Sequence, residues 1–471
     1  MTAIMRPIKA RPATPATRIT ALVTAAAVLV SVWPAQAQVP QKGLPLIRDA
    51  EIEQVLREYT QPILRAAGLA KQNVQVVIIN DRSFNAFVAD GRRIFVNAGA
   101  LMDAETPNQI IGVLAHEAGH IAGGHLARLR EQLAAAQTQM IIAMMLGVGA
   151  VVAGARTGSQ DMGQVGAAAI AAPQAMIQRS LLAYQRSQEE QADRSAVKFL
   201  TATGQSSRGM AETFKRLADQ VLYNVRYIDP YIQSHPMPAE RVAALQTLAQ
   251  NSPHWDKKDP AALQLKHDLM RAKLFGFLER PDTVARRYRL GDNSLAAQYA
   301  RAIASYRFSN PQSALASIDA LIRAQPQNPY FHELKGQALL ETGRPAEAVA
   351  PLRRAVQLAP NPALIQVMLG QALIATNDRR NMDEAVKILR AVIIREPEIP
   401  DAYVQIAMAY GRTGDLGNAD LASAQAALLR GDVKTARGLA ARAKTRFPLG
   451  SPGWVKSDDI VHVKPPDPRR P

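Results

Sequence analysis

Apolar positions in the amino-terminal part of the chain follow first a helical period and then a strand period. Between Asp49 and Ala67 they recur every three or four residues, which predicts an amphipathic helix. A β-branched run from Val74 to Ile79 then predicts a buried strand. Residues 84–88 and 93–97 flank an Asp90-Gly91 step, which is a strong signal for a β-hairpin. The pattern therefore predicts a helix followed by a small sheet.

Helical periods dominate the chain after this sheet. Thr106 precedes Pro107, and proline is favoured at the first helical position, so a helix is predicted to start here and run at least through His120. Because the strands are few and the helices many, the expected fold class is α+β, predominantly helical. Further helices are predicted over Met176–Leu200, Gly209–Leu222 and Ala239–Leu248.

The segment from Gln132 to Ala172 is unusual in composition. It has no charged residue up to Ala155 and is rich in Gly, Ala and Met throughout. Its glutamines and glycines make it a poor transmembrane helix. Three interpretations stay open, namely a mobile lid, a contact with a membrane surface, and a buried helical hairpin.

From about Asp259 onward the pattern changes to pairs of helices without strand signals. Pro326 and Pro360 are 34 residues apart and open similar segments, and 34 residues is the tetratricopeptide period. The next unit runs to Pro397, and degenerate units flank the two clear ones. We therefore expect an α-solenoid with a concave groove that binds peptides or partner proteins, rather than an ordinary helical bundle.

Residues 1–37 have the pattern of a cleavable export signal. Four basic residues precede an uncharged apolar stretch from Ile19 to Val32, and Ala35-Gln36-Ala37 offers the small residues of a cleavage site. The apolar stretch is too short to span a bilayer, which favours cleavage after Ala37 over an uncleaved anchor. The sequence has no cysteine, so neither a lipoprotein anchor nor disulfide bonds can form. A bacterial periplasm suits these features.

The formal net charge of the chain is +16, which is +12 without the four basic residues of the export signal. The excess favours anionic membrane surfaces or acidic partners. It is spread along the chain without a basic run or interleaved aromatic residues, so nucleic-acid binding is not expected.

The segment "VLAHEAGH" at residues 113–120 carries the clearest chemistry. On a helix His116 and His120 lie on one face, so both imidazoles can reach one metal ion. Glu117 projects beside them, where a zinc protease needs a carboxylate that takes a proton from water without binding the metal. The pattern predicts a catalytic zinc site that still lacks its third protein ligand.

Two candidates exist for the third ligand. His125 follows His120 by five residues, whereas the histidine-rich metzincin pattern requires six, so we expect His125 to support or pack against the site. Glu189 and Asp193 lie four apart on a predicted helix, so Glu189 can bind the metal while Asp193 braces a ligand histidine. The alternative for such an acid pair is an ordinary solvated face.

His-Glu-x-x-His, followed about seventy residues later by Glu-x-x-Ala-Asp, resembles the BepA-type periplasmic zinc metallopeptidases of the HtpX-related gluzincin family. This exported branch also has carboxy-terminal tetratricopeptide repeats. The resemblance implies a minigluzincin-like zinc protease domain followed by the α-solenoid. We expect an export signal at 1–37, a metallopeptidase domain at 38–258, a repeat domain at 259–447 and a flexible tail at 448–471.

The resemblance also implies roles for the residues of the motif. His116, His120 and Glu189 would hold one Zn²⁺ per chain. Glu117 would be the general base, and Asp193 would orient a ligand from behind.

Two further segments resemble functional elements of the same family. Asn85-Ala86-Phe87 is similar to an edge strand that would pair with the backbone of a substrate. "SHPMPAER" is similar to a loop over the active site, in which His235 would take the fourth zinc position as a latch or, swung away, help to stabilise the oxyanion. Arg241 matches the trailing arginine of this loop without an assigned role.

The resemblance implies a periplasmic zinc endopeptidase that acts on misassembled outer-membrane β-barrel proteins, with the barrel-assembly machinery as partner. A peripheral contact with the outer membrane is part of this expectation. A second hypothesis is a chaperone or assembly factor that acts mainly through its repeats, with the zinc site latched. A third is a scaffold with a vestigial site.

Overall fold

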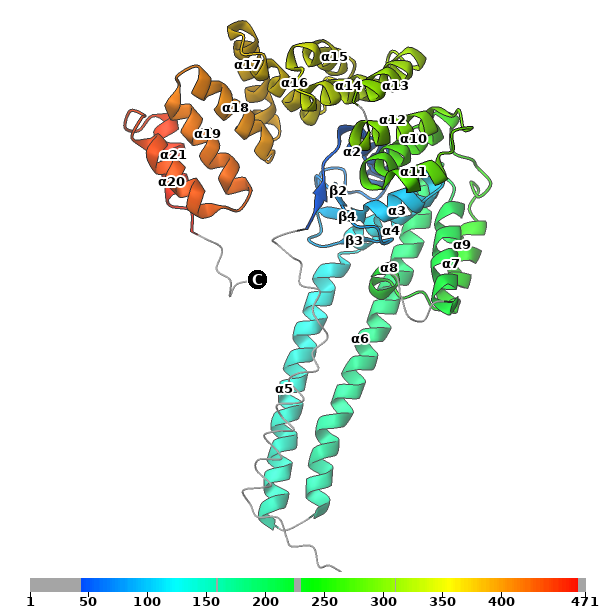
Figure 1. The fold of residues 1–471 in the computed structure, drawn as a ribbon. Helices are drawn as coiled ribbons and strands as arrows, with labels where there is room; N and C mark the ends of the chain where they lie inside the picture. Colours follow the sequence, from blue (N-terminus) through cyan, green and yellow to red (C-terminus); the bar gives the residue numbers. More distant parts are fainter. Residues whose placement is uncertain (1–43, 158–159, 224–229, 310, 465–471) are drawn as a thin grey trace, which may run out of the picture. The chain divides into compact units, whose positions relative to one another are not determined.

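The computed structural model describes residues 44–157, 160–223, 230–309 and 311–464 of the chain (Figure 1). The predicted export signal at residues 1–37 lies outside the described residues.

Four short strands form one mixed sheet in the order β1-β2-β4-β3. β2 runs parallel to β4, while β1 pairs antiparallel with β2 and β3 antiparallel with β4. The predicted hairpin is confirmed: Asp90 accepts hydrogen bonds from two backbone N–H groups of the turn, and Gly91 has a φ of +76° that suits glycine. β3 lies at an edge of the sheet. The strands are β1 (Leu46–Ile47), β2 (Gln75–Ile79), β3 (Ala86–Val88) and β4 (Arg93–Asn97).

Helices α2 (Ala50–Ala66), α3 (Ala98–Asp103) and α4 (Pro107–Ala122) complete this part of the core. The side chain of Asp49 caps α2 by accepting a hydrogen bond from the backbone of Ile52 at 3.0 Å. The apolar stripe of α2 is buried, as its period predicts. α4 begins at the predicted proline and ends where Gly124 adopts a φ of +62°.

The unusual segment from Gln132 belongs to two long helices, α5 (His125–Thr157) and α6 (Gln160–Ala202), which run side by side as a hairpin (Figure 1). The segment is thus a helical hairpin, but the interpretation as a buried hairpin is wrong where its side chains are described. Ile141, Ile142 and Met145 are 50%, 53% and 70% exposed. Among the described residues, no helix is both long enough and apolar enough to cross a bilayer.

Three shorter helices follow the hairpin and end the first half of the chain. They are α7 (Arg208–Tyr223), α8 (Pro230–Ser234) and α9 (Ala239–Gln250). α7 and α9 match the predicted helices; α7 packs on α4 and α9, and α9 also packs on α6.

The predicted repeats are present as successive antiparallel helix pairs. Gly336 and Gly370, which are 34 residues apart, let the two helices of a pair touch, because a Cβ atom at either position would overlap Leu352 or Leu389. The core of the first domain continues without a break into the first repeats. The helices are α10 (Ala261–Leu278), α11 (Pro281–Arg287), α12 (Leu295–Phe308), α13 (Pro311–Ala324), α14 (Pro329–Glu341), α15 (Pro345–Leu358), α16 (Ala363–Ala375), α17 (Arg379–Arg395), α18 (Pro400–Arg412), α19 (Leu416–Leu429), α20 (Val433–Lys444) and α21 (Pro452–Val461).

The last helix corrects the expectation of a flexible tail at 448–471. Ser451 caps α21 by accepting a hydrogen bond from the backbone of Trp454, and Ile460 is buried against the alanines of α20. Lys444 of α20 also pairs with Asp458. The apolar side chains of this segment therefore pack on the preceding helices α19 and α20, and residues 465–471 lie outside the described part of the chain.

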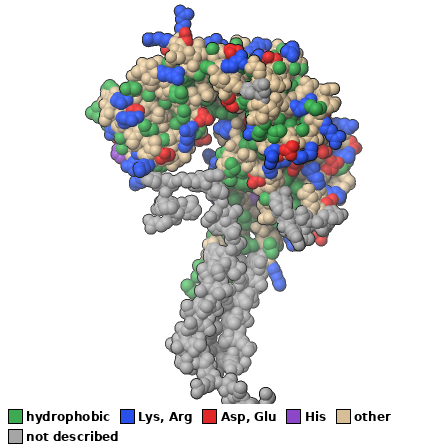
Figure 2. Space-filling model, viewed as in Figure 1, with side chains coloured by type: hydrophobic (Ala, Val, Ile, Leu, Met, Phe, Trp, Pro, Cys, Tyr) green, Lys and Arg blue, Asp and Glu red, His purple; other side chains and the backbone are tan. Residues whose placement is uncertain are grey.

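Charged side chains of both signs are mixed over the visible face of the described protein (Figure 2). Lys and Arg lie among Asp and Glu on this face, and the basic side chains are the more numerous.

Candidate metal centre

Helix α4 presents three of the predicted residues to the protein interior. The side chains of His116 and Glu117 are fully buried, and that of His120 is 12% exposed. Gly119, between them, brings α6 close: a Cβ atom here would lie 2.9 Å from the carbonyl oxygen of Ala192. The glycine of the motif therefore permits the backbone approach that places the acids of α6 opposite the histidines of α4.

Four side chains from three separate elements converge on one point. His116, His120, Glu189 and His235 each offer one nitrogen or oxygen atom, and these four atoms lie within 4.8 Å of one another. The Nε2 atoms of His116 and His120 are 3.0 Å apart, and Oε2 of Glu189 lies 3.3 Å from Nε2 of His116. Nδ1 of His235, from the loop after α8, lies 3.4 Å from Nε2 of His116.

This geometry fits a zinc ion. Zinc binds histidine nitrogen and carboxylate oxygen at about 2.0–2.2 Å with tetrahedral geometry, which separates neighbouring ligand atoms by about 3.3 Å. The observed separations of 3.0, 3.3 and 3.4 Å match that spacing. Three imidazoles and one carboxylate are also the ligand types that zinc prefers.

Charged groups on the side away from the four converging atoms hold the ligand side chains in place. Oδ1 of Asp193 lies 2.9 Å from Nδ1 of His116, which is the nitrogen that faces away from the cluster. Arg241 binds both oxygens of Asp193, at 2.7 and 2.9 Å, and lies 2.9 Å from Oε2 of Glu189. The same guanidinium donates to the backbone carbonyl of Pro236, next to His235. One buried cation thus joins the loop of His235 and Pro236 to both acids of α6.

The pKa values of the acids follow from these contacts. Burial raises the pKa of Glu189, but His235 and His116 outweigh it and hold the pKa well below its usual range. Burial also raises the pKa of Asp193, but the contacts with Arg241 and His116 outweigh burial and lower the pKa below its usual value. Both carboxylates are therefore ionised at neutral pH, as a metal ligand and its supporting acid must be.

Glu117 has a different environment. Neither of its carboxylate oxygens has a hydrogen-bond partner, and Oε1 lies 3.5 Å from Nε2 of His235. Burial raises the pKa of Glu117 above its usual range. A buried carboxylate with a raised pKa beside a metal site is the arrangement that a general base requires.

His125 lies behind the second histidine of the motif. Its Nδ1 atom lies 2.9 Å from Nδ1 of His120, and its Nε2 atom lies 3.0 Å from the side-chain oxygen of Gln191. His125 is outside the converging set, which agrees with the prediction that it supports the site. The contact with Gln191 was not expected, because a glutamine on a helix has no sequence signal of its own.

The predicted substrate-binding residues lie apart from the metal ligands, at the sheet edge. Asn85 precedes β3, and Ala86 and Phe87 belong to it; β3 packs on α4 and on α8. Phe84 contacts Tyr231 edge to face at 5.8 Å, and Tyr231 lies 4.6 Å from the ring of His235. The edge strand thus neighbours helix α4, which carries the motif, and helix α8, which precedes His235.

Comparisons with known proteins agree with this site. A model of peptidase family M48 matches residues 47–249, and two models of tetratricopeptide repeats match residues 299–362 and 339–410. The beta-barrel assembly-enhancing protease of Yersinia pestis is 25% identical over 412 residues, which are 86% of this chain and 82% of the relative. The protein of the same name from Escherichia coli strain K12 is 24% identical over 426 residues, with the same two coverages.

Among solved structures, the crystal structure of YrrB, a tetratricopeptide protein with an unusual peptide-binding site, is 20% identical and covers 49% of this chain and 98% of its own, with a TM-score of 0.28. The match to peptidase family M48 includes all four residues whose ligand atoms converge, His116, His120, Glu189 and His235. Residues 47–249 are therefore a zinc metallopeptidase domain of family M48, and tetratricopeptide repeats follow it in the same chain.

Proposed function

We propose that this protease is a periplasmic zinc endopeptidase that degrades misassembled outer-membrane β-barrel proteins and assists their assembly. The names of its relatives support this role, because both are beta-barrel assembly-enhancing proteases over 86% of the chain. The export-signal pattern at residues 1–37 supports the location. The barrel-assembly machinery is the proposed partner, and the repeats are its proposed binding surface.

In this proposal His116, His120 and Glu189 hold the metal. When bound, zinc activates water and polarises the scissile carbonyl as a Lewis acid. Glu117 accepts the proton of the attacking water and delivers it to the leaving amine, so the peptide bond is hydrolysed without a covalent enzyme intermediate. Asp193 keeps Nδ1 of His116 protonated, and this leaves Nε2 free to bind the metal.

His235 is the proposed latch of this site. Its Nδ1 atom lies with the three ligand atoms, where a catalytic zinc needs an open position for water. The loop must move before a substrate can enter. Proteolysis would therefore depend on an event that draws His235 away.

Substrate would bind along β3 by strand addition. Its outer edge has no strand partner within the described part of the chain, and β3 contacts the motif helix. Stalled β-barrel proteins expose unpaired strands, which fit such an edge. Asn85, Ala86 and Phe87 are the proposed contacts.

The convergence of the ligand atoms beside the buried Glu117 carries this proposal, and a Glu117→Gln variant tests it. The variant should keep one zinc ion per chain and lose cleavage of an unfolded outer-membrane protein by at least about 100-fold. Unchanged cleavage by a purified variant that retains zinc would refute the proposed role of Glu117. Purified wild-type protein without zinc would instead support a vestigial site.

The alternative is a chaperone that acts mainly through its repeats, and the position of His235 within the ligand set favours it. The same Glu117→Gln variant, expressed in cells that lack the wild-type protein, separates the two functions. Loss of cleavage with normal outer-membrane assembly would support the chaperone. Loss of both would support the peptidase.

A further inference from the structure

The hairpin of α5 and α6 exposes apolar side chains away from the metal centre (Figure 1). Ile141, Ile142 and Met145 of α5 are at least half exposed, and Leu182 of α6 is 49% exposed. Ile141 and Met145 are four residues apart, so they lie on one face of the helix. An exposed apolar surface of this kind marks a contact with a membrane or with another protein.

Most of the hairpin also lacks charge. Between residues 132 and 178 the sequence has two charged residues, Arg156 and Asp161, which are of opposite sign. Each charged side chain opposes the entry of a helix into lipid, whereas uncharged side chains enter the lipid interface at low cost. The composition of this part of the hairpin therefore allows contact with lipid.

Four exposed arginines, here called the hairpin arginines, lie nearer the metal centre. Two belong to the start of α5 and two to the facing part of α6, and a single acid, Glu131, accompanies them in residues 125–132 and 179–187. Four arginines against one glutamate leave an excess of three positive charges. The hairpin arginines are Arg128, Arg130, Arg179 and Arg186.

Contacts between the two helices show where the arginines lie along the hairpin. At its base Gln188 donates a hydrogen bond to the backbone carbonyl of His125 at 3.3 Å, and Gln191 lies 3.0 Å from the ring of the same histidine. An α-helix rises about 1.5 Å per residue, so all four arginines lie within about 18 Å of this base, whereas Ile141 lies about 24 Å from it. Positive charge near the base thus gives way to exposed apolar side chains farther along.

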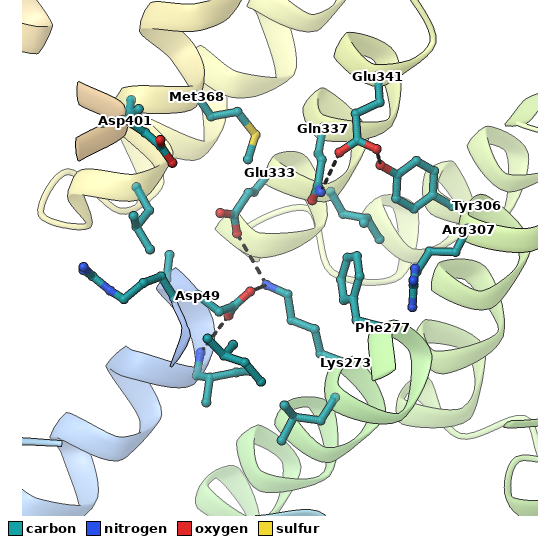
Figure 3. Close-up of a pocket in the computed structure, with 18 of the residues that line it drawn as sticks. Asp49, Lys273, Phe277, Tyr306, Arg307, Glu333, Gln337, Glu341, Met368 and Asp401 are labelled. Carbon is teal, nitrogen blue, oxygen red and sulfur yellow. Dashed lines mark hydrogen bonds and ion pairs between the residues drawn. The ribbon is translucent and has the colours of Figure 1, made fainter. Parts of the chain in front are cut away.

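None of the hairpin arginines forms an ion pair within the described part of the chain. By contrast, Arg194 farther along α6 pairs with Glu190 at 3.5 Å. In a cavity lined by α10 and α14, Lys273 likewise lies 2.8 Å from Asp49 (Figure 3). The positive charge of the hairpin arginines is therefore available to an anion outside the protein.

A bilayer with anionic headgroups matches this order of side chains. Long arginine side chains reach phosphate groups while their stems pack on apolar surface, and each basic residue near an anionic leaflet adds attraction. Apolar side chains beyond them can then contact the acyl chains. A second copy of the hairpin has only two acids, Glu131 and Asp161, and so offers no acidic surface to the arginines.

We propose that the hairpin docks on a bilayer that contains anionic lipids. Ile141, Ile142 and Met145 enter the lipid, and the hairpin arginines bind the headgroups. This inference goes beyond the proposed function and rests on it only for which membrane is concerned. His120 and Glu189 lie at the base of the hairpin, so docking would hold the metal centre within about 20 Å of the headgroups.

Partition onto vesicles tests the inference without any cleavage. The protein consists of residues 38–471, because the apolar stretch at residues 19–32 would itself bind lipid. The probes are vesicles of phosphatidylcholine alone and vesicles in which about one-third of the lipid is phosphatidylglycerol. Flotation should show at least about tenfold stronger partition onto the anionic vesicles, and high salt should reduce this preference.

Two sets of substitutions separate the charge from the apolar contact. Replacing the hairpin arginines with glutamine should lower partition onto anionic vesicles at least about tenfold, whereas replacing them with lysine should retain it. Replacing the three apolar residues with glutamine should also lower it at least about tenfold. The variants are Arg128→Gln/Arg130→Gln/Arg179→Gln/Arg186→Gln, its lysine counterpart, and Ile141→Gln/Ile142→Gln/Met145→Gln.

Matched controls lie at exposed positions outside the hairpin and should bind vesicles as the wild type does. They are Arg323→Gln/Arg379→Gln/Arg380→Gln/Arg437→Gln and Leu290→Gln/Ile394→Gln/Met408→Gln. Thermal unfolding followed by circular dichroism verifies that every variant folds.

Equal partition of the wild type onto both kinds of vesicle overturns the inference, as does unchanged partition of either glutamine variant of the hairpin. A dimer in sedimentation velocity that the apolar variant loses would assign this face to a second copy instead. Cleavage of a water-soluble unfolded polypeptide reports separately on the proposed function, because the substituted residues lie outside the metal centre. Its absence in the wild type would refute the peptidase while leaving the vesicle result intact.

Discussion

Nδ1 of His235 lies 3.0 Å from Oε2 of Glu189, although one residue belongs to a loop and the other to a long helix. In the proposed mechanism this contact places an imidazole where substrate and water would enter. His235 would then have to leave the site before hydrolysis could begin.

We therefore expect His235→Ala to raise the rate of client cleavage. A hydrogen bond to a charged group contributes about 1.5–3 kcal/mol, so its loss should increase the active fraction by about tenfold or more. The measurement is the rate of degradation of an unfolded outer-membrane protein by purified enzyme. His254→Ala, in a loop outside the site, is the control. A rate that is unchanged or lower in His235→Ala would show that the loop histidine assists the reaction rather than blocking it.

The contact between Asp193 and His116 should govern metal affinity. Asp193→Asn removes the negative charge that orients the imidazole, and loss of such a supporting group typically lowers metal affinity by about 10–100-fold. Competition with a zinc chelator measures this directly, without reference to activity. Glu190→Gln, an exposed neighbour on α6 that pairs with Arg194, is the matched control. Equal zinc affinity in both variants would argue against the role of Asp193.

The close approach of α4 and α6 at Gly119 should make the site sensitive to substitution of this glycine. Gly119→Ala would bring a methyl group within 2.9 Å of the carbonyl oxygen of Ala192, and such overpacking costs about 1–3 kcal/mol. We expect a lower midpoint of thermal unfolding and weaker zinc binding, since the ligands of the two helices move apart. Gly438→Ala is the control, because nothing lies near its added methyl group and alanine favours the helix by about 1 kcal/mol. A stabilised Gly119→Ala variant would contradict this account.

Periodicity predicted most of the local structure and part of the site. The spacing of four residues placed His116 with His120, and Glu189 with Asp193, on common helical faces, and the structure brings both faces together. The sequence alone could not show the role of Arg241, because an arginine in the first turn of a helix is usually solvated, whereas this one is buried between two acids. Its contacts depend on three segments that meet only in the folded chain.

The errors came from segments in which local composition and tertiary packing disagree. "KPPDPRRP" made the end of the chain look flexible, but the preceding residues 452–461 carry a capped helix that α20 buries. The uncharged stretch after Gln132 left a buried hairpin as one of three interpretations, yet its described side chains are largely exposed. Composition shows how many apolar side chains a segment has. It does not show whether another part of the folded chain packs against them.

A buried histidine far from the metal centre predicts how stability depends on pH. Nδ1 of His267 lies 3.0 Å from the hydroxyl of Tyr59, and Nε2 lies 2.8 Å from the carbonyl oxygen of Ala104. Burial, opposed by the hydrogen bond to Ala104 and assisted by nearby Arg271, lowers the pKa of His267 to about 4. The imidazole is therefore neutral in the folded protein at neutral pH.

Since the pKa is near 6.5 in the unfolded chain, protons bind the unfolded state first as the pH falls. Stability from this residue is complete above pH 6.5 and declines by up to about 3 kcal/mol towards pH 4. His267→Gln should be less stable than wild type at pH 7.5, and this difference in urea midpoint should shrink at pH 4.5. His332→Gln, at an exposed position of α14, should follow the wild type at both pH values. A difference between His267→Gln and wild type that stays constant with pH would show that His267 contributes packing and hydrogen bonds only, without titrating on unfolding.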